Sequence, residues 1–310
     1  MGHPNIERRT LLGMAMVMAV IGRTPAQPAP EIIELWPGLP PDGPGPSGPE
    51  NVNAKGSVTN VSRPRLIAYP PAHPNGTAAI VVAGGGYAHI EAGHESTPAC
   101  QWLQSIGVTA FELIYRLPED GWKPLAPFQD GQRAMRIVRA RAATYAIDPA
   151  HIGMIGFSAG GHLAGMTSVR PEEALYKHED AADAVSARPD FTGLIYPVLT
   201  MMPPFDKTHA KREILGQHPT EAESAAWSVE RHVNEHTPPM FLAQAADDPI
   251  SPVDNSVMMT NALRAAQVRC ELHVFQSGGH AWGMGRPGTE EQAWPALYAA
   301  WARVNGFLPT

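Results

Sequence analysis

The stretch IGFSAGGH, residues 155–162, decides how the rest of the chain is interpreted. An apolar run precedes it and small residues follow it, an order that predicts a strand, a sharp turn and a helix. A serine in such a turn has neighbours so close that a Cβ at either flanking position would clash, which explains Gly156 and Gly160. The motif therefore predicts a nucleophile elbow at Ser158. Because five residues alone are a weak signal, the prediction depends on what lies before and after them.

The first 26 residues predict an export signal. Two arginines, Arg8 and Arg9, precede an apolar run at residues 11–21, and small residues follow this run up to Ala26. The run is too short to anchor the chain in a bilayer, so no membrane anchor is expected after cleavage. It resembles a twin-arginine signal, although Glu7 stands where Ser or Thr is usual, which leaves the Tat and Sec routes both open. We expect a periplasmic or extracellular protein.

Composition narrows the class of protein. With 310 residues, of which 44% are hydrophobic and 17% charged, the chain can bury one substantial core. We expect a Pro- and Gly-rich arm at residues 27–60 and a single domain at residues 61–310. Cleavage of the signal takes the formal net charge from −7 to −9, and an acidic protein without a basic cluster is a poor nucleic-acid binder. The sequence does not indicate an oligomeric state.

Strands and helices alternate along the domain. Apolar runs predict strands at residues 32–35, 66–69, 78–83, 108–115, 152–155, 191–198, 240–246 and 271–275. Helices are expected at residues 98–105, 128–145, 162–167, 253–266 and 290–304. This order predicts an α/β fold with a mostly parallel central sheet and helices on both faces. A polar, partly helical insertion at about residues 199–236 is expected to cover the site.

Four groups that can carry chemistry follow predicted strands. They are the glycine loop GGGY at residues 84–87, Ser158, the pair Asp247 and Asp248, and His280. Groups at the carboxyl ends of parallel strands meet at one edge of a sheet. The order of oxyanion loop, Ser, Asp and His along the chain is that of α/β-hydrolases. The sequence therefore predicts an α/β-hydrolase fold with a serine nucleophile.

Each group has a defined task in acyl transfer. Ser158 needs His280 to accept its proton, and His280 needs Asp247 or Asp248 to hold its tautomer. The aspartate that does not bind His280 is expected to cap or solvate the turn. The N–H groups of Gly85, Gly86 and Ala159 are the predicted oxyanion hole.

Such a mechanism requires no metal and no organic cofactor. The histidines contain no His-Glu-x-x-His pair, and His89, His94 and His162 lack a convincing set of further ligands. His162, on the helix after the elbow, is expected to serve packing.

Other residues receive structural interpretations. The arginines of the helix at residues 128–145 are expected on a solvated surface rather than in a polyanion site, and Asp130 is expected to interact with the dipole at the helix start. Cys100 and Cys270 are expected to be separate buried thiols, with a disulfide as the minority alternative. Three tryptophans are candidates for stacking on sugars or, equally, for the core: Trp122, Trp227 and Trp282.

From about residue 78 to residue 283 the chain resembles the bacterial acetyl-xylan esterase and feruloyl-esterase-like branch of the α/β-hydrolases. The matching segments are GGGY at 84–87, HE at 94–95, YRL at 115–117, Asp130, DP at 148–149, GFSAGGHL at 156–163, RPDF at 188–191, YPV at 196–198 and PPMFL at 238–242. The resemblance implies the triad Ser158, Asp248 and His280. DPISPVDNS at residues 248–256 aligns without a gap with the acid segment of the family and so favours Asp248 over Asp247.

The chain departs from the family at Ala83, where Pro or His is usual, and at Ala281 and Trp282, which replace a common Gly-Phe. Tyr87 and Trp282 are candidate substrate contacts. The resemblance implies a secreted serine esterase that removes short acyl groups, acetyl above all, from cell-wall carbohydrates such as acetylated xylan. One alternative is a hydrolase with the same triad that acts on feruloyl or other esters, peptides, amides or lactones. A non-catalytic binding protein with this fold is the alternative from another class.

Overall fold

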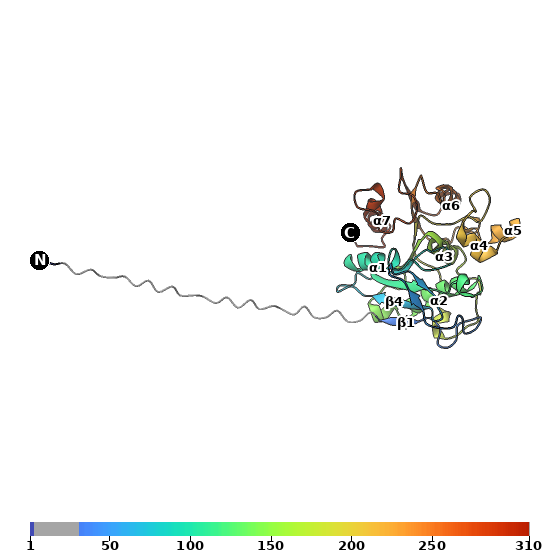
Figure 1. Cartoon of the computed structure of the whole chain (residues 1–310), viewed down its shortest axis with the longest axis horizontal. Coiled ribbons are helices and arrows are strands. Elements are labelled where there is room, and N and C mark those ends of the chain that lie inside the picture. Colours follow the sequence, from blue (N-terminus) through green and yellow to red (C-terminus); the bar gives the residue numbers. More distant parts are fainter. Residues whose placement is uncertain (3–30, 310) are drawn as a thin grey trace.

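Among the described residues, a sheet of eight strands lies at the centre of the molecule (Figure 1). The structure is a computed structural model that describes residues 1–2 and 31–309. The strand order is β1-β4-β6-β5-β7-β8-β9-β10, in which β1 and β4 are antiparallel to their neighbours and the remaining pairs are parallel. The strands are β1 (Ile32–Glu34), β4 (Arg65–Tyr69), β5 (Ala78–Val82), β6 (Thr109–Ile114), β7 (Ile152–Phe157), β8 (Thr192–Ile195), β9 (Met240–Ala245) and β10 (Cys270–Phe275). The predicted mostly parallel sheet is confirmed.

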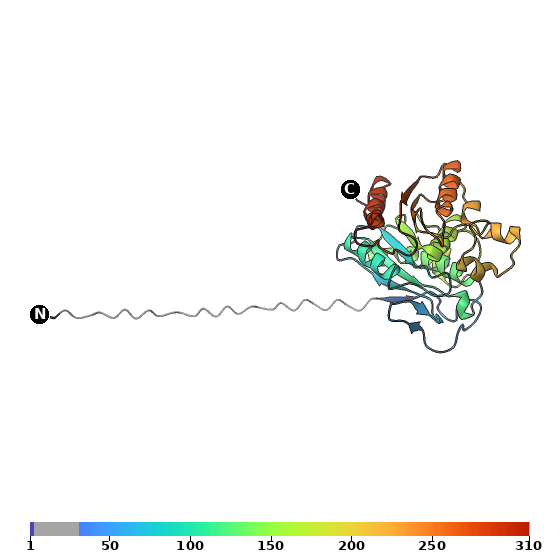
Figure 2. The same cartoon turned by 45° about the horizontal axis from the view of Figure 1, so that its top comes forward.

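Helices cover both faces of this sheet (Figure 2). They are α1 (Ser96–Ser105), α2 (Ala126–Ala140), α3 (Ser158–Val169), α4 (His209–Leu215), α5 (Glu221–Ala226), α6 (Asp254–Ala265) and α7 (Trp294–Val304). β5 is buried along its whole length, and alternate residues enter opposite cores. Ala79 and Val81 belong to the core of α1 and α7, whereas Ile80 and Val82 belong to the core of α2, α3 and α6. A strand buried on both faces has this continuous apolar sequence because both sides exclude water.

The N-terminal arm is part of the same sheet. β1 is the edge strand and pairs with β4, and a separate antiparallel pair joins β2 (Asn51–Val52) to β3 (Val58–Thr59). The short strand expected at residues 32–35 is therefore confirmed. The predicted export signal lies outside the described residues, except for the first two.

Helix α2 corrects two expectations. Arg133 is buried and forms ion pairs with Asp180 and Asp183, so it does not lie on a solvated surface. Asp130 is the fifth residue of α2 rather than a residue of its first turn, and its fully buried carboxylate pairs with the buried guanidinium of Arg116 at 2.8 Å. Arg116 is thus the buried counterion of Asp130. The sequence pattern does not predict this pair, because the two residues belong to different elements.

Cys100 and Cys270 are both free thiols, as expected, but only Cys100 is buried, whereas Cys270 is partly exposed. Burial raises the pKa of the Cys100 thiol, which disfavours the reactive thiolate. Across the described part of the chain, every helix is too short or too polar to cross a membrane.

Candidate active site

Ser158 lies at the junction of β7 and α3 with a left-handed backbone, φ 50°. Non-glycine residues rarely adopt this conformation, and it persists only where the surroundings enforce it. A Cβ at Gly156 would lie 2.2 Å from the carbonyl oxygen of Gly160, and a Cβ at Gly160 would lie 2.3 Å from that of Val82. Only glycine fits at either position. The predicted strand, sharp turn and helix at the elbow are confirmed.

Two hydrogen bonds connect Ser158 to His280 and to Asp248. The Ser158 hydroxyl lies 2.8 Å from Nε2 of His280, and Nδ1 of His280 lies 2.7 Å from Oδ2 of Asp248. The carboxylate accepts only, so Nδ1 carries the proton and Nε2 is free to accept one from the serine. Three residues that lie far apart in the sequence therefore form one proton-transfer chain.

The structure distinguishes the two aspartates. Asp248 is 5% exposed, and its Oδ1 accepts hydrogen bonds from the N–H groups of Ile250 and Ser251 at 2.8 and 2.9 Å. Asp247 is exposed, and its Oδ1 accepts the N–H of Gly279 at 2.7 Å. Asp248 thus contacts the imidazole, while Asp247 fixes the backbone of the turn before it. This is the division of tasks that the acid segment of the sequence favoured.

The glycine loop after β5 lies beside the serine. A Cβ at Gly84 would be 2.7 Å from Cβ of Ser158, and Gly85 and Gly86 have φ values of 114° and 66°. The N–H of Gly84 donates to Glu95, whereas those of Gly85 and Gly86 have no acceptor among the described residues. Ala159 follows Ser158 in the first turn of α3, where N–H groups lack an intrahelical acceptor. These three N–H groups are available to an oxyanion.

A cavity of about 320 Å³ is lined by Gly85, Gly86, Ser158, Ala159 and His280. Polar side chains on its wall come from the loop after β5 and from the insertion, namely His89, Glu91, Thr208 and His209. Apolar side chains line it as well, namely Val198, Ala210 and Ile250. The start of α4, within the insertion, therefore lies on the wall of the pocket, and the expectation that the insertion covers the site stays a prediction. No pattern in the sequence indicates which insertion residues reach the pocket.

The structure contradicts the two candidate substrate contacts. Tyr87 and Trp282 are 0% and 1% exposed, and neither lines the pocket. The Tyr87 hydroxyl lies 2.9 Å from Nδ1 of His162, and Trp282 packs edge-on against Tyr196. Both large rings occupy the core because the turns that follow β5 and β10 direct them inward. Trp122 is also buried, against Arg116, which excludes it as an exposed sugar platform.

His162 serves packing, as expected. It is fully buried, and its Nε2 donates to the carbonyl of Trp227 at 2.7 Å. Burial without a carboxylate lowers the pKa of His162 to about 4, so the ring is neutral at ordinary pH.

Two site residues had no predicted role. Glu95 is buried at the start of α1, lines the pocket, and accepts the hydroxyl of Tyr196 at 2.9 Å. Burial raises the pKa of the Glu95 carboxyl. Both residues occur in segments that carry the family resemblance, HE at residues 94–95 and YPV at residues 196–198, but neither segment indicates a partner for them.

His209, on the wall of the pocket, lies close to two carboxylates. His209, Glu213 and Glu119 offer ligand atoms within 4.8 Å of one another. Arg212 donates to Nδ1 of His209 at 2.8 Å, and Nε2 therefore carries the proton and pairs with Glu213. A protonated ring nitrogen is not a metal ligand, so this arrangement favours a hydrogen-bond network around a neutral His209.

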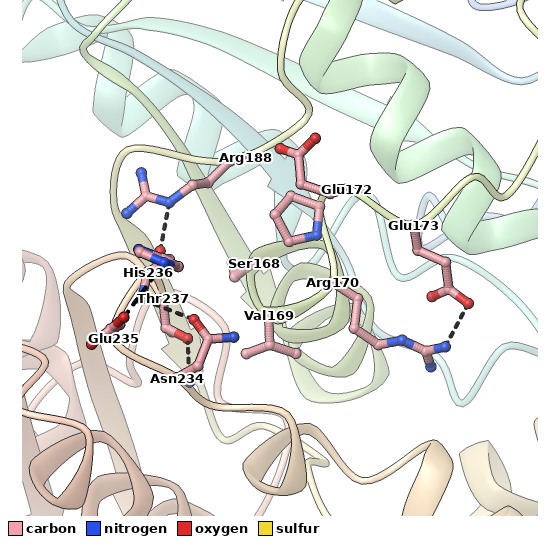
Figure 3. A pocket seen from close by; sticks show the side chains of 11 residues that line it. Ser168, Val169, Arg170, Glu172, Glu173, Arg188, Asn234, Glu235, His236 and Thr237 are labelled. Carbon is pink, nitrogen blue, oxygen red and sulfur yellow. Dashed lines mark hydrogen bonds and ion pairs between the residues drawn. The ribbon is translucent and has the colours of Figure 1, made fainter.

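A larger groove of about 700 Å³ lies near the other end of α3 (Figure 3). Its walls include Arg170, Arg188 and the loop at residues 234–237, and Arg188 is occupied by the carbonyl of His236 at 2.7 Å. Ten helical residues separate Ser168 in this groove from Ser158, a distance of about 15 Å at 1.5 Å per residue. The groove is distinct from the pocket that holds the serine.

Relatives of the chain are esterases and carbohydrate-active enzymes. Xylanase B of Butyrivibrio fibrisolvens is 36% identical over 65% of this chain, and an acetylxylan esterase of Xylanibacter ruminicola is 32% identical over 74%. The chain spans only 32% and 46% of the length of these two proteins. Among solved structures, an acetyl ester-xyloside bifunctional hydrolase from Caldicellulosiruptor lactoaceticus is 33% identical, with a TM-score of 0.79 over 92% of this chain and 100% of that one.

An esterase of Thermogutta terrifontis, 28% identical, aligns with a TM-score of 0.68 over 87% of this chain and 98% of its own. The neighbours are α/β-hydrolase esterases, in agreement with the sheet and the elbow of this chain. The family model named BD-FAE matches residues 67–263, well over half of the chain. The chain belongs to the BD-FAE family of α/β-hydrolases.

Proposed function

We propose that the protein is a serine ester hydrolase that removes short acyl groups, acetyl above all, from carbohydrates such as acetylated xylan. The observation that carries the proposal is the unbroken chain of hydrogen bonds from Ser158 through His280 to Asp248, with the serine open to a pocket. The esterase relatives support the reaction class.

The mechanism follows from the positions of these groups. His280 takes the proton of Ser158 as its oxygen attacks the ester carbonyl. The negative charge that develops on the carbonyl oxygen is stabilised by the N–H groups of Gly85, Gly86 and Ala159, each worth about 3 kcal/mol. His280 then protonates the leaving alcohol, which departs and leaves an acyl-enzyme. A water molecule repeats the sequence and releases the acid.

The pocket supports a small acyl group on a hydroxyl-rich alcohol. Val198, Ala210 and Ile250 provide an apolar surface for an acyl chain. His89 lines the same pocket, and its Nδ1 offers a polar group to sugar hydroxyls, since its Nε2 is occupied by Glu91. The acetyl ester-xyloside hydrolase and the acetylxylan esterase among the relatives are consistent with such a substrate.

Replacing Ser158 with Ala tests the proposal. The variant should lose the hydrolysis of p-nitrophenyl acetate and the labelling by a fluorophosphonate, because it lacks the nucleophile. Ser168→Ala is the matched control, since Ser168 is buried on the same helix and bonds to Ala164. Unchanged turnover in Ser158→Ala would refute the mechanism. A panel of acetylated xylan, butyrate esters and feruloyl esters then tests the substrate, and faster hydrolysis of feruloyl esters would replace acetyl as the preferred group.

Export is a second element of the proposal. The arginine pair, the apolar run and the small residues up to Ala26 support a cleaved signal. Expression of the full chain in a bacterium, followed by fractionation and N-terminal sequencing, should give a protein that begins near Gln27 outside the cytoplasm. An uncleaved cytoplasmic chain would contradict this expectation.

A further inference from the structure

We propose that Glu95 is a positioning residue of the ester hydrolase site, because its carboxylate connects the oxyanion loop to the loop that carries His280. The inference rests on the function proposed for Ser158 and His280. No part of that function assigns a task to Glu95.

The two loops need such a connection because the sheet does not supply one. The oxyanion loop follows β5 and the His280 loop follows β10, and β7, β8 and β9 separate these strands in the sheet. No ladder of backbone hydrogen bonds therefore relates one loop to the other. Their relative position depends on side chains that bridge the strand ends.

Glu95 provides the bridge through both carboxylate oxygens. Oε2 accepts the N–H of Gly84 at 2.5 Å, and Oε1 accepts the hydroxyl of Tyr196 at 2.9 Å. The Tyr196 oxygen in turn accepts the N–H of Gly283 at 3.0 Å, three residues after His280. Tyr196 follows β8, between the two loops, and its ring lies edge-on to His280 with centroids 5.0 Å apart. A single buried chain of hydrogen bonds thus runs from the oxyanion loop to Gly283, in the loop that carries the base.

The preceding residue strengthens the connection. Nε2 of His94 donates to the carbonyl of Ala281 at 2.8 Å, so two consecutive side chains at the start of α1 hold the segment after His280. Ala281 has a left-handed φ of 55°, a conformation that the surrounding contacts have to maintain in a residue with a Cβ. Only Glu95 of the two also reaches the oxyanion loop.

The position of Gly84 makes the bridge relevant to catalysis. Gly84 lies so close to Ser158 that a Cβ at this position would be 2.7 Å from Cβ of the serine. It also directly precedes Gly85 and Gly86, whose N–H groups are assigned to the oxyanion. A shift of Gly84 moves those donors away from the carbonyl oxygen, and hydrogen bonds to a developing oxyanion weaken steeply with such misplacement. The effect belongs to the transition state, so kcat rather than KM should respond.

Glu95→Gln keeps the size of the side chain and removes its ability to accept at both ends. Its amide can accept from Gly84 or from Tyr196 but must present a donor to the other. We expect kcat for p-nitrophenyl acetate to fall about 10- to 100-fold with KM changed less than about threefold. The affinity for a boronic acid that forms a tetrahedral adduct with Ser158 should fall by a similar factor.

Tyr196→Phe tests the second link and keeps the ring. It should lower kcat about 5- to 10-fold, and the double variant should be no slower than Glu95→Gln alone, because Tyr196 acts through Glu95. If Glu95→Gln does not fold, Tyr196→Phe decides by itself.

The chain offers a matched control. Glu112 is a second buried carboxylate, and it accepts the hydroxyl of Tyr69 at 3.0 Å and that of Ser96 in α1 at 2.6 Å. It does not line the pocket. Glu112→Gln and Tyr69→Phe should lower the melting temperature and leave kcat within about twofold, as expected of substitutions that act on stability alone.

The outcomes separate this inference from the proposed function. Wild-type kcat in Glu95→Gln, a loss confined to KM, or additive losses in the double variant would overturn the role of Glu95. So would an equal loss of kcat in Glu112→Gln. Activity retained by Ser158→Ala would instead overturn the proposed function.

Discussion

Replacing Asp248 with Asn is the most direct test of how His280 is activated. The carboxylate of Asp248 receives four hydrogen bonds: from His280 and Gln244 on Oδ2, and from the N–H groups of Ile250 and Ser251 on Oδ1. In the Asp248→Asn variant, the side-chain oxygen of the new amide would have to accept the two backbone donors, since they cannot become acceptors. The NH₂ group of the amide would then face His280, whose Nδ1 would lose its proton to accept this donor. Nε2 would carry the proton and could no longer accept one from Ser158.

The magnitude follows from this exchange of tautomers. When the base is held in the wrong tautomer in a serine hydrolase, kcat falls on the order of 10⁴-fold, or about 5.5 kcal/mol at the transition state. Asp247→Asn is the matched control, because Asp247 accepts only the N–H of Gly279 and an amide oxygen can still do so. Its kcat should fall less than about tenfold.

The assay is the initial rate of p-nitrophenyl acetate hydrolysis at pH 7 to 8, with circular dichroism to confirm folding. KM should change little in either variant, because neither aspartate lines the pocket. A larger loss in Asp247→Asn, or a loss below about tenfold in Asp248→Asn, would show that the hydrogen bond at 2.7 Å does not set the tautomer.

Three further predictions concern the frame around the site. In Gly160→Ala, the new Cβ would lie 2.3 Å from the carbonyl of Val82, so we expect loss of soluble folded protein or of activity, and an active, stable variant would refute the close approach. In Asp130→Asn, the buried Arg116 loses its counterion, so urea unfolding should show a loss of about 3 to 5 kcal/mol, and a loss below about 1 kcal/mol would contradict the argument. His162 has its pKa lowered to about 4, so the unfolded chain binds more protons below pH 6.5 and stability should fall by about 2 kcal/mol from pH 7 to pH 5. His162→Gln should remove that part of the decline, and an unchanged slope would assign it to other groups.

The elements of the fold could be predicted because their signals are local. β5 and β7 are continuous apolar runs, and each is followed by glycines that only a tight turn explains. Ser158 and His280 could be predicted for the same reason, since Ser158 follows β7 directly, His280 follows β10 after a short turn, and parallel strands bring their carboxyl ends to one edge. The structure brings these two side chains into hydrogen-bond contact. Their catalytic roles stay predictions until variants are measured.

Contacts between distant segments could not be predicted. An arginine and an aspartate on separate elements carry no signal of their pairing, and so Arg116 and Asp130 were not recognised as a buried ion pair. Tyr87 and Trp282 follow chemistry-bearing turns, which made them candidates for substrate contact, but the turns direct both rings into the core. His209 reaches the pocket only because the insertion folds back over it. In each case, packing decides the outcome rather than local pattern.

The two adjacent aspartates show where local reasoning succeeds and what it leaves out. The acid segment favours Asp248 as the partner of His280, and the structure has this contact at 2.7 Å. A turn-capping task was expected for the other aspartate, but no local pattern indicates that Asp247 holds the N–H of Gly279, beside the same histidine. One aspartate therefore orients the imidazole and the other fixes its backbone, while Glu95 holds the far side of the same loop through Tyr196. Three acidic residues, two of them adjacent in the turn after β9 and one just before α1, thus hold the loop of His280. The loss of kcat in each variant should depend on which part of the loop that variant releases. Asp248 governs the tautomer, Glu95 the geometry of the oxyanion loop, and Asp247 only the precision of the turn.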